Sequence, residues 1–173
     1  MKKKLMTIIA LATIFIFAGA QNSPQKKVVR AEVKQAPATI EIFDGKKIHH
    51  SDAEWKKILS NDQYYITREK GTEPTWSSEF NKNKDKGVYY CVSCNLPLYS
   101  SDNKFESGTG WPSFYKPVNP KNVFVAKDNT MGMERDEVLC ARCEAHLGHV
   151  FNDGPQPTGL RYCMNGVALK FKK

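Results

Sequence analysis

Long hydrophobic runs are nearly absent from this sequence of 173 residues. The longest uncharged apolar run, Leu5 to Ala18, covers about 14 residues, whereas a membrane-spanning helix needs about 20. Lysines at positions 2 to 4 precede the run and Ala18-Gly19-Ala20 ends it, which predicts a secretory signal peptide over residues 1–20. No cysteine follows, which argues against a lipoprotein anchor and leaves an uncleaved anchor as the alternative. We therefore expect an exported protein, periplasmic or secreted, that meets the membrane only during export.

Acidic residues are outnumbered by basic ones, 18 against 26, so the net charge is +8. The signal segment holds three lysines and no acidic residue, and its removal leaves +5. A basic surface can bind nucleic acid, but these lysines are scattered and several lie near the chain ends. The pattern favours a solvated surface and no nucleic-acid partner.

Internal repeats are also lacking, apart from two Cys-x-x-Cys motifs. Residues 21–45 are polar and have no hydrophobic period, so we predict a flexible linker there. Residues 46–173 are enough for one domain with one core. Nothing in the sequence indicates an oligomer, and we expect a monomer.

Within this domain the pattern changes from helix to strand. Ser51-Asp-Ala-Glu54 is a capping box and predicts a short helix through Ile58 and Leu59, with Trp55 on the same face. A second short helix is predicted from about Asp62 to Glu69. Short β-rich runs broken by Gly and Pro then predict a mainly β fold of antiparallel strands. These runs are residues 88–92, 123–127, 137–140, 162 and 167–171.

Cysteine is scarce, with five in the chain, yet four of them form two Cys-x-x-Cys pairs. Cys91 and Cys94 make one pair, and Cys140 and Cys143 make the other. Two such pairs can place four thiolates around one tetrahedral Zn²⁺. The alternatives are two disulfides or a redox-active pair, but a redox pair stands at the start of a helix after a βαβ strand, and neither motif does. We predict a closed structural zinc site.

Cys163 is then left over, and an odd free thiol is a candidate reactive residue. Arg161 lies two positions before it, on the same side if residues 160–164 form a strand, and a nearby guanidinium stabilises a thiolate. The alternative is a buried cysteine that acts as a small hydrophobe. The polar neighbours of Cys163 favour the reactive thiol.

Five short motifs follow one another between residues 91 and 165. They are Cys91-x-x-Cys94, Ser107-Gly-Thr-Gly-Trp111-Pro-Ser-Phe114, Cys140-x-x-Cys143, His146-Leu-Gly-His149-Val-Phe-x-Asp153-Gly-Pro and Gly159-Leu-Arg-Tyr-Cys163-x-Asn165. In this order they resemble the type B methionine sulfoxide reductase family, over roughly residues 48–171. The resemblance implies a β-tent fold, with two antiparallel sheets braced by zinc. It also implies thiol-dependent reduction of the R epimer of peptide-bound methionine sulfoxide, because separate enzymes handle the two epimers.

The resemblance also implies roles for individual residues. Cys163 would be the nucleophile, with Arg161 beside it. His149 would donate the proton or organise a bound water. Asp153 would orient His149 or that water, and Asn165 would hydrogen-bond the substrate or Cys163.

A methyl-sulfinyl group has an apolar methyl and a basic oxygen, so its pocket needs an aromatic wall as well as a proton source. By the same resemblance Trp111 would supply the wall, His146 would help to shape the pocket, and Phe114 would lie with them. The alternative is that Trp111 and Phe114 are ordinary core aromatics.

Many members of this family carry a resolving cysteine where this chain has Thr109. If the other four cysteines bind zinc, no thiol is left for an internal disulfide. We therefore expect a Cys163 sulfenic acid that an external reductant, a small thiol or a thioredoxin-like protein, returns to the thiol. The substrates would be oxidised exported proteins.

Two other functions explain parts of the sequence. An exported zinc-ribbon-like binding module without catalysis would explain the paired cysteines, but not Cys163, Trp111 or His149. A thiol oxidoreductase that acts on disulfides would need a second exchangeable cysteine, and only Cys163 is available.

Overall fold

The computed structural model describes residues 39–173, except for the side chain of Met131. The expected signal peptide and residues 21–38 of the expected linker lie outside this range. The described residues form one compact unit. Within residues 39–173, no helix has the length and apolar character needed to cross a membrane.

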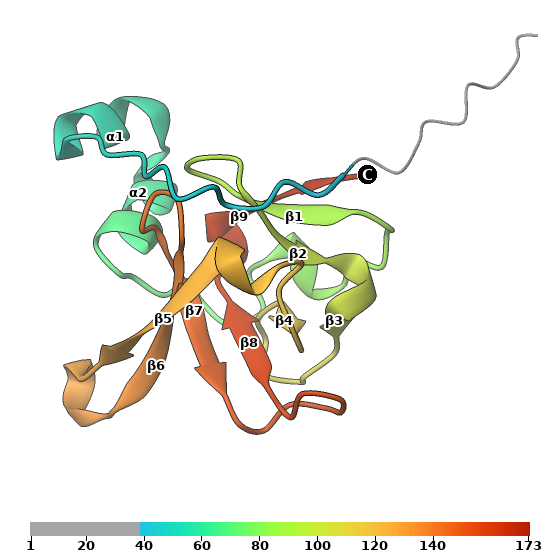
Figure 1. Ribbon diagram of the computed structural model, residues 1–173. Coiled ribbons are helices and arrows are strands. Elements are labelled where there is room, and N and C mark those ends of the chain that lie inside the picture. The colour runs from blue at the N-terminus through green and yellow to red at the C-terminus, as the bar shows by residue number, and fades with distance from the viewer. Residues whose placement is uncertain (1–38) are drawn as a thin grey trace, which may run out of the picture. The chain divides into compact units, whose positions relative to one another are not determined.

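Two short helices precede the strands (Figure 1). α1 spans Asp52–Ile58 and α2 spans Asn61–Arg68, and a capping box opens each of them. Trp55 of α1 is buried, and the Arg68 guanidinium lies over its ring, 3.9 Å from the centroid. This cation–π contact joins the two helices. Both helices predicted from the sequence are confirmed.

Within the described residues, nine strands form two antiparallel sheets (Figure 1). The three-stranded sheet has the order β2-β1-β9, with β1 (Val88–Cys91), β2 (Pro97–Ser100) and β9 (Leu169–Lys172). The six-stranded sheet has the order β3-β4-β8-β7-β6-β5, with β3 (Lys104–Phe105), β4 (Ser113–Phe114), β5 (Val123–Asp128), β6 (Arg135–Cys140), β7 (His146–Phe151) and β8 (Arg161–Met164). The predicted mainly β fold of two antiparallel sheets is confirmed.

The folded domain begins earlier than the predicted boundary at residue 46. Buried Asn122 accepts a hydrogen bond from the Phe43 N–H at 2.8 Å and donates one to the Glu41 carbonyl at 2.9 Å. A buried side-chain amide needs such partners, and this segment supplies them. Residues 41–43 are therefore part of the domain and not of a flexible linker.

An aromatic cluster joins the two sheets in the core. Phe114 of β4 stacks on Tyr99 of β2 with ring centroids 4.5 Å apart, and it meets Tyr89 of β1 edge-on at 5.0 Å. All three side chains are fully buried. The expectation that Phe114 lines a substrate pocket is therefore wrong. Strand alternation turns it to the core, while its neighbour Ser113 points to the opposite face.

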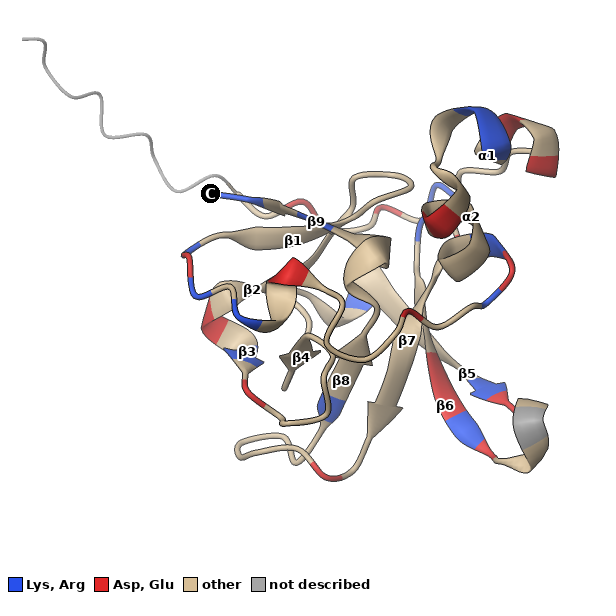
Figure 2. Ribbon diagram, turned by 180° about the vertical axis from the view of Figure 1, so that it is seen from behind, with Lys and Arg blue, Asp and Glu red and all other residues tan. Residues whose placement is uncertain are grey.

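Charged residues of both signs are interspersed over the domain (Figure 2). β6 carries both signs within three residues, from Arg135 to Glu137. Lys127 of the neighbouring β5 contacts two carboxylates, those of Glu134 and Asp136, at 2.9 and 3.0 Å. The scattered lysines of the sequence thus lie among acidic partners here.

A bulge in β7 places two histidines on one face. His146 and His149 are three residues apart, a spacing that puts side chains on opposite faces of a regular strand. The pairing with β6 shifts at this point, so that Leu147 is an extra residue in β7. The two imidazole rings consequently lie together, with centroids 5.4 Å apart.

Gly148 lets β7 approach β8 closely. Its φ is +152°, and a Cβ at this position would lie 2.1 Å from the Cys163 carbonyl oxygen. No side chain fits there without a shift of the backbone. Gly148 thus sets the distance between the strand that carries His149 and the strand that carries Cys163.

Gly148→Ala should destabilise the domain by about 3 kcal/mol or more, since overpacking costs about 1–3 kcal/mol and backbone strain about 1–3 kcal/mol. Gly159→Ala is the matched control. Its φ is +70°, but no atom lies within 4 Å of the added carbon, so we expect a loss of only about 1–2 kcal/mol. Urea unfolding measures both. Equal losses would contradict the role of the close approach.

Candidate active site and metal centre

One row of side chains crosses four strands of the six-stranded sheet. Ser113 in β4 lies opposite Cys163 in β8, and Cys163 lies opposite His149 in β7. His149 in turn lies opposite Glu137 in β6. Directly opposed residues of antiparallel strands lie on one face of the sheet. The register thus brings a hydroxyl, a thiol, an imidazole and a carboxylate together from distant parts of the sequence.

Cys163 is half-buried, and hydroxyl groups adjoin its sulfur. The Thr109 Oγ1 lies 3.8 Å from the Cys163 Sγ. Ser107 continues this chain of hydroxyls, with its Oγ 2.9 Å from Thr109 Oγ1 and 2.7 Å from Ser113 Oγ. Burial raises the pKa of the Cys163 thiol, while the hydroxyls and the Arg161 charge only partly oppose the rise. Arg161 therefore acts in the expected direction, but burial outweighs it.

Asp153 holds Arg161. The Arg161 Nε and Nη2 each donate a 2.8 Å hydrogen bond to this carboxylate, and the guanidinium lies 4.4 Å from the centroid of the Phe151 ring. The pair lowers the pKa of Asp153, so Asp153 carries a negative charge that offsets the Arg161 charge near Cys163. The carboxylate that holds His149 is a different one.

Asp128, at the end of β5, holds His149. Its Oδ2 lies 2.9 Å from His149 Nε2 and accepts a 2.8 Å hydrogen bond from Arg135 Nη2. The Thr130 hydroxyl and N–H donate to its other oxygen at 2.7 and 3.0 Å. The hydrogen bonds from Thr130 and His149 hold the pKa of Asp128 well below its usual range. A charged carboxylate thus fixes one nitrogen of the ring that lies opposite Cys163.

A second carboxylate, that of Glu137, holds His146. Glu137 is 1% exposed, its Oε1 lies 2.7 Å from His146 Nδ1, and its Oε2 accepts a 2.8 Å hydrogen bond from Lys70 Nζ. Burial lowers the pKa of His146 despite this neighbour, which favours the neutral ring. The Nε2 of His146 is buried and has no hydrogen-bond partner among the described residues.

Glu73, in the loop after α2, links Trp111 to Asn165. Its carbonyl accepts a 3.1 Å hydrogen bond from Trp111 Nε1, and its N–H donates to Asn165 Oδ1 at 3.0 Å. The Asn165 Nδ2 donates to the Leu147 carbonyl at 3.3 Å. Both ends of this amide therefore bond to the main chain. Asn165 here fixes the Trp111 loop against β7 and is not hydrogen-bonded to Cys163.

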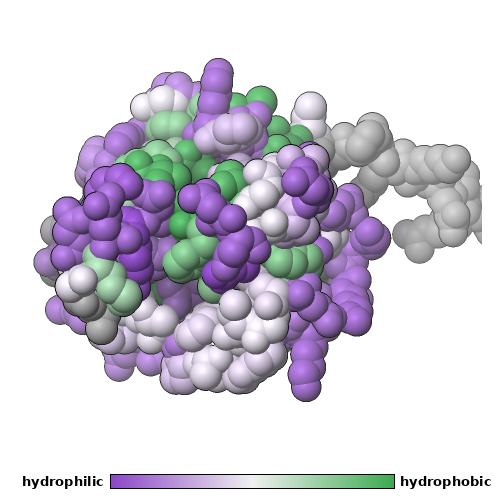
Figure 3. Space-filling view, turned by 90° about the horizontal axis from the view of Figure 1, so that it is seen from below, coloured by the Kyte–Doolittle hydropathy of each residue, from purple (hydrophilic) through white to green (hydrophobic). Residues whose placement is uncertain are grey.

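Figure 3 views the molecule from the end at which β7 finishes and β8 begins. Hydrophobic side chains gather near the middle of this view, between hydrophilic side chains. The residues described above supply a thiol, two imidazoles, a guanidinium and an indole. Together they suit an apolar group that carries one polar, proton-accepting oxygen.

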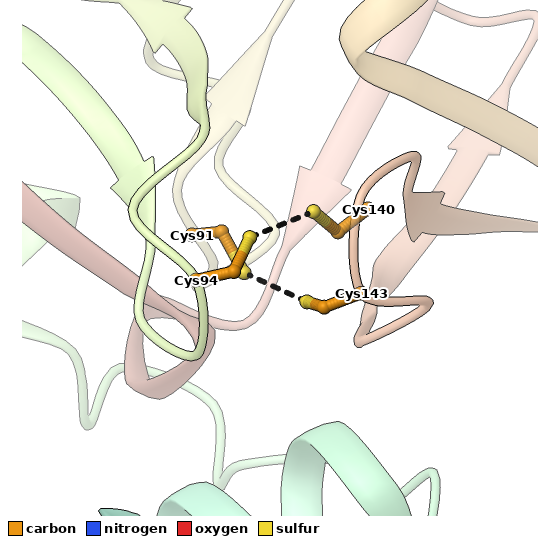
Figure 4. Close-up of side chains that lie close together, drawn as sticks. All are labelled: Cys91, Cys94, Cys140 and Cys143. Atoms are coloured by element: carbon orange, nitrogen blue, oxygen red, sulfur yellow. Dashed lines mark hydrogen bonds between the residues drawn. The ribbon is translucent and has the colours of Figure 1, made fainter. Parts of the chain in front are cut away.

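Four other sulfurs converge at a second place (Figure 4). Cys91 and Cys94 come from the end of β1 and the turn that follows, and Cys140 and Cys143 from the end of β6 and its turn. All four Sγ atoms lie within 4.8 Å of one another, with Cys91 to Cys143 at 3.7 Å and Cys94 to Cys140 at 3.5 Å. Zinc–sulfur bonds of about 2.3 Å give tetrahedral edges of about 3.8 Å, whereas disulfide sulfurs lie about 2.05 Å apart. The donor set fits one tetrahedral metal ion better than two disulfides.

The four thiols of this cluster shift one another's ionisation, and an arginine adjoins them. The nearby sulfurs of Cys140 and Cys143, together with burial, raise the pKa of Cys91 well above its usual value. A bound metal ion reverses this effect and keeps such thiols deprotonated. Arg68 braces the cluster from α2, because its Nη1 donates to the Cys143 carbonyl at 2.8 Å and its Nη2 lies 3.5 Å from the Cys143 sulfur.

Comparison with known proteins identifies the family, because the model of the SelR domain matches residues 59–173. The chain belongs to the SelR family, the type B methionine sulfoxide reductases. A peptide methionine sulfoxide reductase MsrB of Leptospira interrogans is 56% identical to this chain over 127 residues, which are 73% of this chain and 97% of that relative. Proteins of the same name from Methanosarcina mazei and Pseudomonas putida strain GB-1 are 53% and 50% identical over 127 residues, 73% of this chain and 91% and 97% of theirs.

The sequence motifs identified the candidate reacting groups but not the residues that hydrogen-bond to them. Cys163, Arg161 and both histidines lie together, as the resemblance implies. Their partners Asp128, Glu137, Lys70 and Glu73 were missed. These partners meet the histidines and Trp111 only through cross-strand register and loop packing, and a single sequence gives no signal for either.

Thr109→Val should slow alkylation of Cys163 by iodoacetamide at pH 7 by about 2- to 5-fold. The change removes a hydroxyl that stabilises the thiolate, and such a net hydrogen bond is worth about 0.5–1 kcal/mol. The pKa of Cys163, already raised by burial, should rise further, so the rate–pH profile moves to higher pH. Peptide mass spectrometry at Cys163 gives the rate. Thr158→Val is the control, because its exposed hydroxyl donates to the Tyr115 carbonyl and accepts from the Leu160 N–H, away from Cys163; equal rates in both variants would contradict the role of Thr109.

Proposed function

We propose that this chain reduces peptide-bound methionine-R-sulfoxide to methionine, with Cys163 as the nucleophile. The observation that carries the proposal is the placement of Cys163 directly opposite His149, on the face that also holds Arg161 and His146. The names and the 50–56% identity of the SelR relatives support the same substrate class.

The reaction needs one nucleophile and one proton. The Cys163 thiolate attacks the sulfoxide sulfur, and the oxygen is protonated and transferred to the cysteine. Methionine then leaves, and Cys163 is oxidised to a sulfenic acid, so the two electrons gained by the substrate come from Cys163. Trp111, fixed by Glu73, lines the place of the methyl group.

Proton delivery contributes more to the rate than thiol activation. Lowering a thiol pKa from about 8.5 to about 7 raises the thiolate fraction about 15-fold but loses about 5-fold in nucleophilicity, a net gain of about 3-fold. A positioned general acid is worth about 10² to 10⁴. Burial here raises the pKa of Cys163, so we assign the larger contribution to His149, held by Asp128. The neutral His146 completes the pocket.

The second half of the cycle uses an external thiol. Thr109 occupies the position at which many family members have a resolving cysteine, and the other four cysteines form the metal cluster. The sulfenic acid at Cys163 is then reduced by a small thiol or by a thioredoxin-like protein.

Zinc is the metal that the four cysteines would hold. Four thiolates complete its tetrahedral shell and leave no open position, so the ion supplies structure and not catalysis. The cluster joins the end of β1 to the end of β6, and thus one sheet to the other.

Export is the remaining part of the proposal. The basic start, short apolar run and small residues of positions 1–20 support a secreted or periplasmic enzyme that repairs oxidised exported proteins. We propose that it acts as a monomer.

The first experiment measures turnover of the separated R and S sulfoxide epimers of a methionine peptide with dithiothreitol. We expect the chain to reduce the R epimer alone. Cys163→Ser should have no activity, because a serine hydroxyl is a much weaker nucleophile than a cysteine thiolate. Turnover of neither epimer by a folded, metal-loaded sample would contradict the proposed function. Equal turnover of both epimers would contradict its stereochemistry.

The same enzyme, taken through one turnover without reductant, provides a second readout. Mass spectrometry should find one added oxygen on Cys163 and no disulfide to it. A disulfide between Cys163 and any other cysteine would rule out the external-thiol step.

Metal removal should unfold the domain. Structural zinc sites contribute about 10–16 kcal/mol in peptide systems, a large term beside the net stability of a small domain. A strong chelator should therefore abolish both near-UV circular dichroism and reductase activity, and added Zn²⁺ should restore them. Cys163→Ser, which keeps the four ligands, should show the same loss of dichroism. Dichroism and activity that survive complete metal removal would refute the structural role.

A further inference from the structure

A cleft of about 460 Å³ opens beside the proposed active site. Its lining includes Trp76, Lys82, Lys84, Ser107, Gly110 and Trp111. A larger cavity of about 860 Å³ lies between α2 and the turn Gly166–Ala168, but neither Cys163 nor either histidine of the site lines it. These three residues do not line the smaller cleft either, but its lining includes Trp111 and Ser107, which adjoin the proposed active site.

Two residues belong to both the cleft and the active site. Trp111 lines the cleft and forms the proposed wall of the methyl-sulfinyl pocket. Ser107 also lines it, and its hydroxyl lies 2.9 Å from the Thr109 hydroxyl, which lies 3.8 Å from the Cys163 sulfur. The cleft therefore adjoins the site and offers one path for the polypeptide on either side of a methionine sulfoxide at Cys163.

Trp76 is an exposed aromatic side chain held in an unusual conformation. It is 62% exposed, and its φ of +65° is costly for a bulky residue. Its N–H donates a 2.8 Å hydrogen bond to the Gly110 carbonyl, which also accepts one from Asn81 Nδ2 at 2.8 Å. Its indole covers Gly110 so closely that an added Cβ there would lie 3.1 Å from the ring. These contacts hold the solvent-exposed Trp76 indole against the loop that carries Trp111.

The cleft also carries positive charge. Two lysines line it, and the Glu106 carboxylate, 3.0 Å from Lys84 Nζ, offsets the charge of one of them. Lys82 is exposed and has no ion pair among the described residues. A carboxylate on an incoming peptide therefore finds an available cation beside Trp76.

We propose that this cleft binds the residues that flank methionine sulfoxide in a polypeptide substrate. The Trp76 ring stacks on a neighbouring side chain or peptide group, and Lys82 favours an acidic flank. This proposal rests on the proposed function, and it makes the enzyme selective for peptide-bound over free methionine sulfoxide.

The test compares three R-sulfoxide substrates reduced with dithiothreitol: the N-acetyl-methionine amide, a pentapeptide with acidic flanks and one with lysine flanks. Trp76→Asn removes the ring and keeps a residue that tolerates positive φ. The ratio of kcat/KM for the acidic peptide to that for the amide should exceed 1 in the natural chain. It should fall by about 3- to 10-fold in Trp76→Asn, as expected for loss of an aromatic contact.

Reversal of the charge at Lys82 tests the proposed preference for acidic flanks. Lys82→Glu should lower the ratio of acidic to lysine-flanked peptide turnover by about 3- to 10-fold at low salt, and the effect should shrink as salt rises. Lys57→Glu on α1 makes the same change of net charge at an exposed position outside the cleft, so that ratio should stay constant.

The outcomes separate this proposal from the proposed function. If the natural chain reduces none of the three sulfoxides, the reductase assignment fails. If it reduces the amide but the peptide-to-amide ratio is the same in Trp76→Asn, the cleft does not bind substrate. Equal changes in Lys82→Glu and Lys57→Glu would show that overall charge, and not the cleft, selects the flank.

Discussion

The site depends on the pairing of β8 with β4 on one side and with β7 on the other. Ser113, Cys163 and His149 oppose one another across these strands, so a slip of one residue in either pairing would turn Cys163 or its neighbours to the other face. Two features resist such a slip. The bulge at Leu147 specifies the register of β7, and Phe114 anchors β4 in the aromatic core.

Charges on this face occur in opposed pairs. Asp153 with Arg161, Asp128 with Arg135, and Glu137 with Lys70 each combine a carboxylate and a cation. Because every carboxylate near the histidines has its own cation, the rings are oriented by charged groups without a large net field at the sulfur. Burial then has the largest effect on the pKa of the Cys163 thiol, and the proposed chemistry depends on a positioned proton donor.

The sequence predicted local features well and contacts across strands poorly. The capping box at Ser51, the mainly β character and the convergence of the paired cysteines follow from short spacings. β7 was not predicted, because Gly148 and the bulge interrupt its alternation. Asp128 and Glu137 could not be matched to their histidines, since the matching depends on which strands pair. Phe114 was misplaced because its motif does not reveal which face of β4 is buried.

An enzyme that repairs oxidised methionine meets the oxidants that made its substrate, and its own sulfurs are open to the same damage. The exposures of the metal cluster decide where that damage starts. Cys91, Cys140 and Cys143 are at most 3% exposed, whereas Cys94 is half-buried. An oxidant therefore reaches the cluster first at Cys94. Oxidation of Cys94 would leave three thiols where a tetrahedral ion needs four ligands, so the integrity of the proposed metal centre depends most on its most exposed cysteine.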